Sequence, residues 1–598
     1  MCGIVGYIGK RDSVNILING LHKLEYRGYD SAGICVLDNE NLSLVKEQGQ
    51  IEALVSRLSS RPISGAIGIA HTRWATHGEP SERNAHPHMD CHGDIAIVHN
   101  GIIENYQSLK KLLQDEGHKI VSQTDSEIFA HLVEKFYQGD LEQAVRSALQ
   151  LVEGAYGLAV LHRQERKIIA ARRGSPLILG LGLGEMYIAS DVPAILQHTK
   201  EIVYLDDNEL AEVTADGYNI KNLSGQVVDK NIEHIKWSVE ELEKKGYKHF
   251  MLKEIFEQPE AIANTLRGRV KNGQIKLSLN LPKKIQRIII SACGTSWHSG
   301  LIGKYLLESL SGIITEVDYA SEFRYRQPLI GPEDLLIVIS QSGETADTLG
   351  ALREAKARGA HTLGIVNVVG STISREVESG IYLHAGPEIG VASTKAFSCQ
   401  VTALLVLALF LRQESGRELD QDLLSELDKL SEYINKSLEQ DQVAQEIADK
   451  FKAVKNFLYL GRGLNFPVAL EGALKLKEIS YIHAEGYPAA EIKHGPIALV
   501  DKKMPVVFLA SKSHLSPKLI SNMQEIKARG GIIISVTNNQ EEEVAKQSDY
   551  VLTVPQVRDE LSPIINVIPL QLLAYHIADL RGLDVDKPRN LAKSVTVE

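Results

Sequence analysis

The chain has 598 residues, of which 24% are charged, and a formal net charge of -11 at pH 7. This length exceeds what one hydrophobic core supports, so we expect roughly three or four domains of about 150 residues each. The acidic balance and the absence of a long lysine and arginine run argue against nucleic acid or an anionic membrane as partner, and favour a small-molecule substrate.

The cysteines are few and scattered, without the close spacing of a zinc site or a disulfide framework: Cys2, Cys35, Cys91, Cys293 and Cys399. We therefore expect no metal and a reducing compartment, the cytoplasm. The start of the chain lacks the basic and apolar segments of a secretory signal. The longest apolar stretch, residues 401–411, is too short to cross a bilayer and predicts a buried helix.

The second residue, Cys2, becomes N-terminal if Met1 is removed. Its free α-amine would then titrate near ~8, so that one residue would supply both a thiol nucleophile and the base that accepts its proton. A cysteine at this position more often has no such role. The interpretation therefore depends on the rest of the chain.

The first ~220 residues contain short alternating or β-branched segments with helical patterns between them, at residues 3–8, 66–70 and 95–98 among others. This pattern predicts layered α and β structure rather than a strict parallel βαβ series. The highly charged residues 239–249 end the pattern. We place a domain junction there.

The second half of the chain repeats four apolar strands at an offset of about 170 residues. Residues 287–294 correspond to 456–463, 335–340 to 506–511, 364–367 to 534–537, and 382–383 to 551–552. Strands that alternate with helices predict two doubly wound α/β domains with parallel sheets. In such domains ligands bind at the carboxyl ends of the strands.

A hydroxyl-rich loop follows the strand at 335–339, and a helical pattern at 346–358 follows the loop. The loop reads Ser340, Gln341, Ser342, Gly343, Glu344 and Thr345. Free N–H groups at a helix start bind phosphate and hydroxyls add donors, whereas a helix cap needs one hydroxyl only. Thr295 and Ser296 follow the first strand of this copy, so both loops could hold one anion. The loops at 461–464 and 511–514 of the second copy lack this pattern.

The first helix of the second copy carries Lys475 and Glu478, three residues apart on one face. From this spacing alone we expect a surface ion pair.

Together these features resemble the glutamine:fructose-6-phosphate aminotransferases (isomerizing), also called glucosamine-6-phosphate synthases, of the bacterial type. The resemblance spans essentially the whole chain, and its motifs are residues 2–6 (CGIVG), 71–78 (HTRWATHG), 99–101 (HNG), 124–127 (TDSE), 340–345 (SQSGET) and 588–598 (PRNLAKSVTVE). It implies a four-layer αββα glutaminase at 2–218, a linker region at 219–274, sugar isomerase (SIS) domains at 275–415 and 447–588, and a tail at 589–598.

The family implies conversion of D-fructose 6-phosphate and L-glutamine to D-glucosamine 6-phosphate and L-glutamate, the first step of hexosamine biosynthesis, without a cofactor. It also suggests a homodimer in which His494 reaches across the subunit interface. The longer glutaminase insertion of eukaryotic members is missing, which argues against feedback inhibition by a nucleotide sugar.

In the glutaminase half, the resemblance assigns Cys2 as the nucleophile and its own α-amine as the proton relay. Asn100 and the Gly101 N–H would form the oxyanion hole, where preorganised donors stabilise developing charge. Arg73 would hold the substrate α-carboxylate and Asp125 its α-ammonium group. Thr76, His77 and Gly78 would line the pocket, and Trp74 would gate an ammonia channel.

In the second half, the resemblance implies that Lys593 forms a Schiff base with the open-chain ketose and that Glu478 moves a proton between C1 and C2. His494 would assist ring opening, and Lys475 would support the transfer. The sugar phosphate would be held by Thr295, Ser296, Ser340, Gln341, Ser342 and Thr345, with Ser393 nearby.

Two alternatives remain at this point. A Cys2 glutaminase could serve another acceptor, although the chain lacks a nucleotide-binding signature. SIS domains also occur in non-catalytic sugar-phosphate sensors, which would carry a DNA-binding module with a basic face. Such a sensor would have no reason to combine Cys2, Asn100, Asp125 and Lys593.

Overall fold

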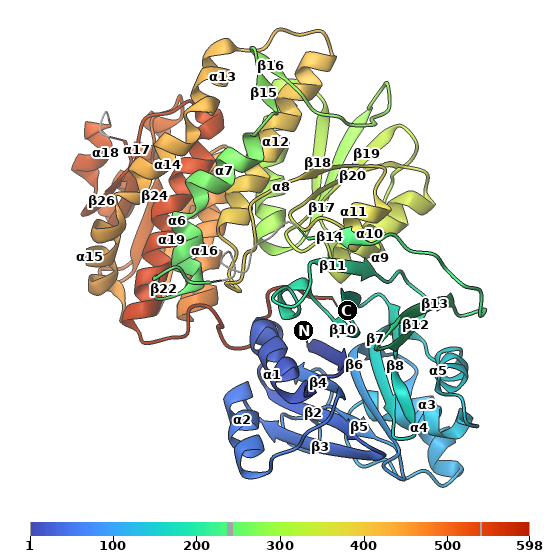
Figure 1. Ribbon diagram of the computed structural model, residues 1–598. Helices are drawn as coiled ribbons and strands as arrows, with labels where there is room; N and C mark the ends of the chain where they lie inside the picture. The colour runs from blue at the N-terminus through green and yellow to red at the C-terminus, as the bar shows by residue number, and fades with distance from the viewer. Residues whose placement is uncertain (1, 236–242, 539–540, 597–598) are drawn as a thin grey trace. The chain divides into compact units, whose positions relative to one another are not determined.

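The computed structural model describes residues 2–235, 243–538 and 541–596, and the chain divides into two units (Figure 1). The first unit holds the chain up to residue 242 together with residues 344–346 and 592–598, and the second holds the rest. Met1, residues 239–242 of the expected junction and the last two residues of the C-terminal motif lie outside the described residues.

The first unit is built on two antiparallel sheets. Their strands are β1 (Gly3–Ile8), β2 (Ser31–Asp38), β3 (Asn41–Gln48), β4 (Ile67–Arg73), β5 (His88–Met89), β6 (Ile95–Ile103), β7 (Gly154–His162), β8 (Glu165–Arg173), β9 (Ile178–Gly182), β10 (Glu185–Ala189), β11 (Glu201–Tyr204), β12 (Glu209–Thr214), β13 (Gly217–Asn222) and β14 (Glu233–His234). One sheet has the order β14-β11-β9-β10-β1-β4-β2-β3, and the other has the order β13-β12-β8-β7-β6-β5.

Helices cover the outer face of each sheet in this unit. Helices α1 (Ser13–Leu24) and α2 (Ile51–Ser60) pack on the first sheet, and α4 (Ser126–Phe136) and α5 (Leu141–Leu149) pack on the second, with α3 (Tyr106–Asp115) beside α4. Ile4, Ile69, Val98 and Ile168 belong to the apolar core between the sheets. Every residue of β1 is buried because one face of the strand meets the other sheet and one face meets a helix. The predicted αββα layering is confirmed.

The second unit contains two parallel five-stranded sheets. The first is formed by β17 (Arg287–Ala292), β18 (Ile314–Tyr319), β19 (Asp334–Ser340), β20 (His361–Val366) and β21 (Ser379–Tyr382) in the order β18-β17-β19-β20-β21. The second is formed by β22 (Asn456–Gly461), β23 (His483–Pro488), β24 (Pro505–Leu509), β25 (Ile532–Thr537) and β26 (Tyr550–Thr553) in the order β23-β22-β24-β25-β26. The duplication predicted from the sequence is confirmed.

The helices of this unit are α6 (Phe250–Phe256), α7 (Gln258–Leu266), α8 (Gly294–Leu306), α9 (Ala320–Tyr325), α10 (Ala346–Ala357, beginning in the stretch grouped with the first unit), α11 (Thr372–Glu376), α12 (Lys395–Glu414), α13 (Gln421–Asp428), α14 (Leu430–Leu438), α15 (Asp441–Phe451), α16 (Asn465–Ser480), α17 (Ser516–Lys527), α18 (Glu542–Gln547) and α19 (Ser562–Leu580). A short hairpin joins β15 (Val270–Lys271) to β16 (Gln274–Ile275).

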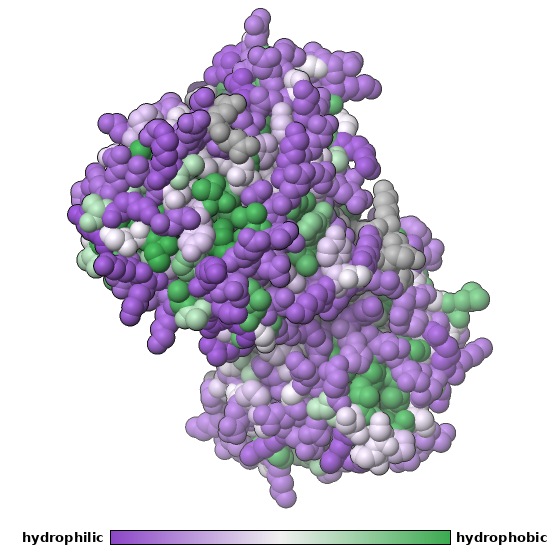
Figure 2. All heavy atoms as spheres, turned by 90° about the vertical axis from the view of Figure 1, so that its left-hand side faces the viewer, coloured by the Kyte–Doolittle hydropathy of each residue, from purple (hydrophilic) through white to green (hydrophobic). Residues whose placement is uncertain are grey.

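Two helical segments are apolar and long enough to cross a membrane: α12, and residues 559–580, which include α19. However, 89% and 100% of their most apolar windows are buried inside the protein, as in the core helices of a soluble protein. The buried helix expected at residues 401–411 is therefore confirmed as part of α12. On the face drawn in Figure 2, hydrophilic residues predominate and apolar residues form limited groups.

Candidate functional site

Cys2 lies directly before β1, a central strand of the first sheet. The backbone N–H of Trp74, which follows β4, donates to the Cys2 Sγ at 3.3 Å. Burial raises the pKa of the Cys2 thiol, and the Trp74 N–H and the Arg73 guanidinium only partly oppose this. The resting thiol is therefore protonated at neutral pH, so a reaction at Cys2 needs a base.

Asn100 lies near the end of β6 and is held on both sides of its amide group. Its Nδ2 donates to the Cys2 carbonyl oxygen at 3.0 Å, and its Oδ1 lies 3.1 Å from His71 Nε2. The His71 Nε2 also lies 3.0 Å from the His99 carbonyl oxygen. Because both partners are acceptors, Nε2 carries the proton. Burial lowers the pKa of His71 to about 3, so the ring is neutral and fixes the Asn100 amide with its donor toward Cys2.

Gly101 must be glycine where it stands. Its φ is 134°, and a Cβ added there would lie 2.0 Å from the Ala155 carbonyl oxygen. This backbone conformation is costly for any residue with a side chain. Only glycine fits here, so the backbone N–H that follows Asn100 has no side chain of its own beside it.

Arg73 and Asp125 carry opposite charges near Cys2. Burial lowers the pKa of Arg73, while the Asp30 and Asp125 carboxylates and, when it is ionised, the Cys2 thiolate act in the opposite direction. Asp125 immediately precedes α4, and its Oδ2 accepts the Ile103 N–H at 2.8 Å.

The loop after β4 is held by Arg73, which donates to the carbonyl oxygens of His77 and, at 3.0 Å, Gly78. Thr76 lies on the same loop, and the Ala75 N–H donates to Asp30 Oδ2 at 2.8 Å. The sequence motifs did not indicate Asp30 or the orienting role of His71. The contact of Asp30 with the Ala75 N–H and the contact of His71 with Asn100 each join segments that are far apart in the chain. His71 lies within a motif, however, and could have been considered.

In the second unit, the two hydroxyl-bearing loops follow adjacent strands. Ala292 at the end of β17 pairs with Ile339 of β19, so the loops that follow lie at one edge of the sheet, as predicted. Gly343 has φ of 69°, and a Cβ there would meet Ser371 Oγ at 2.0 Å. The Gly343 N–H donates to Ser340 Oγ at 3.0 Å, which shapes the loop.

The other expected phosphate-binding residues lie near these loops or on neighbouring segments. Ser296 is buried on the first turn of α8, and its Oγ accepts from Gln400 Nε2 at 3.0 Å. Gln341 and Ser342 lie between Ser340 and Gly343, and Ser393 lies before α12. Thr345 precedes α10 and falls in the stretch 344–346 that groups with the first unit.

The expectation of a surface ion pair at Lys475 was wrong, because Lys475 is buried on the face of α16 that packs against α8. Its Nζ lies 2.6 Å from Glu478 Oε2 and 3.4 Å from Glu471 Oε1, and donates to Thr295 Oγ1 at 3.1 Å. Burial alone would lower the pKa of Lys475, but the two carboxylates outweigh it and raise this pKa. Lys475 therefore stays charged and links the second copy to Thr295, on the first turn of α8 in the first copy.

Glu471 is a member of this cluster that the sequence analysis missed. It is fully buried, and its carboxylate accepts from Thr295 Oγ1 at 3.1 Å and contacts His298 Nδ1 at 2.7 Å. The signal was available, because Glu471, Lys475 and Glu478 recur at helical spacing on one face of α16.

Two further predicted residues lie elsewhere in the chain. His494 is exposed at the end of a short 3₁₀ helix, Ala489–His494. Lys593 lies in the tail segment 592–598, which groups with the first unit. Their roles stay predictions.

Family models match both units of the chain. The model described as "Glutamine amidotransferase domain" matches residues 59–255, and the model described as "SIS domain" matches residues 283–410 and 450–580.

Among similar proteins is the glutamine--fructose-6-phosphate aminotransferase [isomerizing] of Chlorobaculum tepidum, which is 53% identical over 100% of both chains. The protein of the same name from Thermus thermophilus is 50% identical, again over 100% of both chains. A solved structure, the C-terminal domain of glucosamine-fructose-6-phosphate aminotransferase from Francisella tularensis, matches with a TM-score of 0.56 and 42% identity, covering 58% of this chain and 99% of that chain.

Proposed function

The chain belongs to the family of isomerizing glutamine–fructose-6-phosphate aminotransferases, and we infer from this that it converts D-fructose 6-phosphate and L-glutamine to D-glucosamine 6-phosphate and L-glutamate. The observation that carries the inference is the arrangement at Cys2, where Asn100 Nδ2 is held 3.0 Å from the Cys2 carbonyl oxygen. This arrangement lies in an amidotransferase domain that precedes two SIS domains.

We propose that Cys2 attacks the side-chain amide carbon of glutamine. The buried thiol gives its proton to the α-amine of Cys2, which becomes available when Met1 is removed, and the amine passes the proton to the leaving ammonia. The resulting thioester is hydrolysed by water to glutamate. Asn100 Nδ2 and the Gly101 N–H stabilise the oxyanion that forms during attack.

Recognition of the amino-acid end of glutamine is assigned to the two charges near Cys2. Arg73 binds the α-carboxylate through its planar fork, and Asp125 binds the α-ammonium group. Thr76, His77 and Gly78 line the pocket, and Trp74 controls the passage of ammonia. The convergence of Cys2, Asp30 and Asp125 on Arg73 supports this assignment.

The sugar phosphate is assigned to the loops after β17 and β19, with the binding residues Thr295, Ser296, Ser340, Gln341, Ser342, Thr345 and Ser393. Lys593 forms a Schiff base with the ketose carbonyl, with loss of water, and Glu478 transfers a proton between C1 and C2. His494 assists ring opening. The buried pairing of Lys475 with Glu478 at 2.6 Å supports a role for Lys475 in holding Glu478 in position.

We further propose that the enzyme is a cytoplasmic homodimer to which each subunit contributes His494 for its partner. Exposure of His494 is consistent with such a role. The proposed functional division of the chain is an amidotransferase domain at 2–218, a linker region at 219–274, SIS domains at 275–415 and 447–588, and a tail at 589–598.

The decisive experiment is a product assay with glutamine and fructose 6-phosphate, run beside a mass measurement of the intact N-terminus. We expect glucosamine 6-phosphate from protein that begins at Cys2, and none from the Cys2→Ala variant, because the nucleophile is lost. The same variant should still isomerise fructose 6-phosphate, which serves as its folding control. Glutamine turnover by Cys2→Ala at the wild-type rate would refute the assignment.

A further inference from the structure

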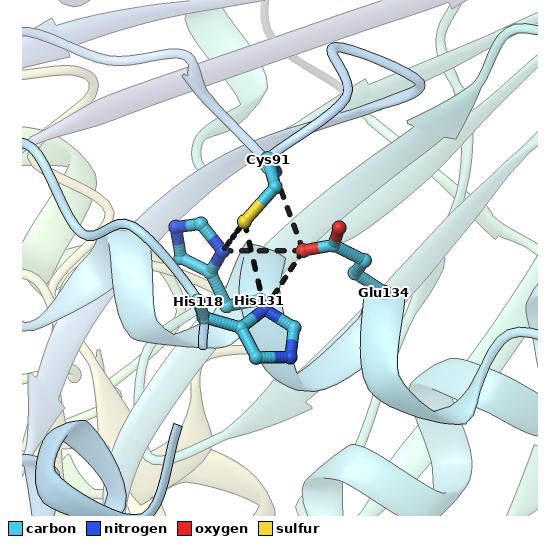
Figure 3. A group of neighbouring side chains, drawn as sticks. All are labelled: Cys91, His118, His131 and Glu134. Carbon is cyan, nitrogen blue, oxygen red and sulfur yellow. Dashed lines mark hydrogen bonds and ion pairs between the residues drawn. The ribbon is translucent and has the colours of Figure 1, made fainter. Parts of the chain in front are cut away.

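Four potential metal ligands converge in the first unit around α4, one of the helices that cover its second sheet (Figure 3). Cys91 lies in the turn between β5 and β6, His118 lies between α3 and α4, and His131 and Glu134 lie on α4. One ligand atom from each of these residues lies within 4.8 Å of all the others. None of the four belongs to the proposed glutamine site.

The spacing of the ligand atoms fits a tetrahedral ion. Zinc bonds of about 2.0 Å to nitrogen or oxygen and about 2.3 Å to sulfur place neighbouring ligand atoms about 3.3 to 3.5 Å apart. The Cys91 Sγ lies 3.4 Å from His131 Nδ1 and 3.7 Å from His118 Nδ1. Glu134 Oε2 lies 3.0 Å from His118 Nδ1 and 3.2 Å from His131 Nδ1.

The surroundings of the cluster orient its ligands. The second ring nitrogen of His131, Nε2, faces Glu127 Oε1 at 3.7 Å, and Glu127 in turn accepts the Val121 N–H at 2.8 Å. A carboxylate behind a histidine is the usual support of a metal-bound imidazole. Here the 3.7 Å separation is an ion-pair distance, and His131 Nε2 has no hydrogen-bond partner among the described residues. The His131 side chain is 1% exposed, which shields the inner side of the group from water.

We propose that Cys91, His118, His131 and Glu134 form a zinc site in the amidotransferase domain. Thiolate and imidazole donors favour zinc over magnesium or calcium, which prefer oxygen ligands. Because four protein ligands complete a tetrahedron, the site is structural. It ties the β5–β6 turn and the α3–α4 connection to α4, the helix that begins just after Asp125. The wide scatter of the cysteines in the sequence hides the site, because its ligands come from three separate segments.

The first test is the zinc content of the full-length protein. After removal of metals with a chelator, incubation with zinc chloride and desalting, we expect about one zinc ion per wild-type chain by elemental analysis. Cys91→Ala and His131→Gln should lose most of it. His22→Gln is the matched control, since His22, Glu25 and Glu52 form another close group of possible ligands that lacks a thiol. Wild-type protein without stoichiometric zinc would overturn the proposal, and so would zinc that is retained by Cys91→Ala and His131→Gln.

A second test uses the wild type alone and so does not depend on the folding of a variant. Zinc should slow alkylation of Cys91 by iodoacetamide at least about tenfold, as measured by peptide mass spectrometry, because a metal-bound thiolate is shielded. Cys293, which is also partly accessible, should react at the same rate with and without zinc. Equal rates at Cys91 would mean that the four side chains form only a hydrogen-bonded cluster.

Discussion

The Asn100 side chain links Cys2 to His71 in the proposed glutamine site, since its amide contacts both the Cys2 carbonyl oxygen and the His71 ring. If it stabilises the oxyanion, Asn100→Ala should lower kcat for glutamine hydrolysis about 10²- to 10³-fold, or about 2.7 to 4 kcal/mol, with little change in KM for glutamine. Glutamate release measures this effect, and fructose 6-phosphate isomerisation is the internal control. A rise in KM with kcat unchanged would instead indicate a role in substrate binding.

The residue types of this site could be predicted from the sequence, but their mutual orientation could not. The family resemblance assigned Cys2 as the nucleophile and Asn100 and Gly101 as oxyanion donors, and these roles stay predictions. The resemblance did not show that the His71 ring fixes the Asn100 amide, because that contact joins β4 to β6 and depends on how the sheets pack.

Helix α16 presents a charged face to the protein interior, with Glu471, Lys475 and Glu478 on one side. Removal of one partner from a buried ion pair leaves an uncompensated charge, so Lys475→Leu should destabilise the second unit by about 3 to 5 kcal/mol. Urea unfolding measures this difference. The exposed Lys477→Leu change on the same helix should stay within about 0.5 kcal/mol of wild type.

Adding Glu471→Gln to Lys475→Leu should recover part of the lost stability, because it removes one of the unpaired carboxylates. Additive losses in the double variant would show that the two side chains act independently.

Strand β4 and the segment leading into β5 bring together buried histidines that are neutral in the folded state. The His86 ring packs 4.1 Å from the His71 ring, and neither of its nitrogens has a hydrogen-bond partner among the described residues. Burial lowers the pKa of His86 well below its ordinary value. The unfolded chain binds this proton below about pH 6.5 while the folded chain does not, so stability falls as the pH drops below that value.

His86→Leu should therefore weaken the acid sensitivity of the first unit. The stability advantage of the variant over wild type should grow on acidification by up to about 1.4 kcal/mol per pH unit. Urea unfolding at pH 7.5 and 5.5, followed through loss of glutaminase activity, tests this. An advantage that is the same at both pH values would exclude titration of His86 as the cause.

For the whole molecule, the duplication of the second half was evident in the sequence, but each copy has one strand that the apolar pattern missed. Strands β18 and β23 each lie at one edge of their sheet and are largely polar and half exposed, so they lack the apolar residues that mark the other four strands in the sequence. The two strands nevertheless occupy equivalent places in the two sheets. The first residue of β17, Arg287, pairs with the first residue of β18, Ile314, and Asn456 of β22 pairs in the same way with His483 of β23. The contact of Glu471 with Thr295 and His298 could not be predicted, because it exists only when the copies pack together.

An enzyme with two active sites must deliver ammonia from one to the other, since ammonia released into water at neutral pH is protonated and loses its nucleophilic lone pair. We expect Cys2→Ala to isomerise fructose 6-phosphate without using glutamine, and Lys593→Arg to hydrolyse glutamine without making the amino sugar. A mixture of these two variants should form no glucosamine 6-phosphate beyond the sum of the separate proteins, as measured by mass spectrometry. Each variant lacks either Cys2 or Lys593, so no chain in the mixture carries both. Exchange of subunits would therefore not restore delivery of ammonia within one chain. Product formation in proportion to the glutaminase activity of the mixture would mean that ammonia travels through solvent.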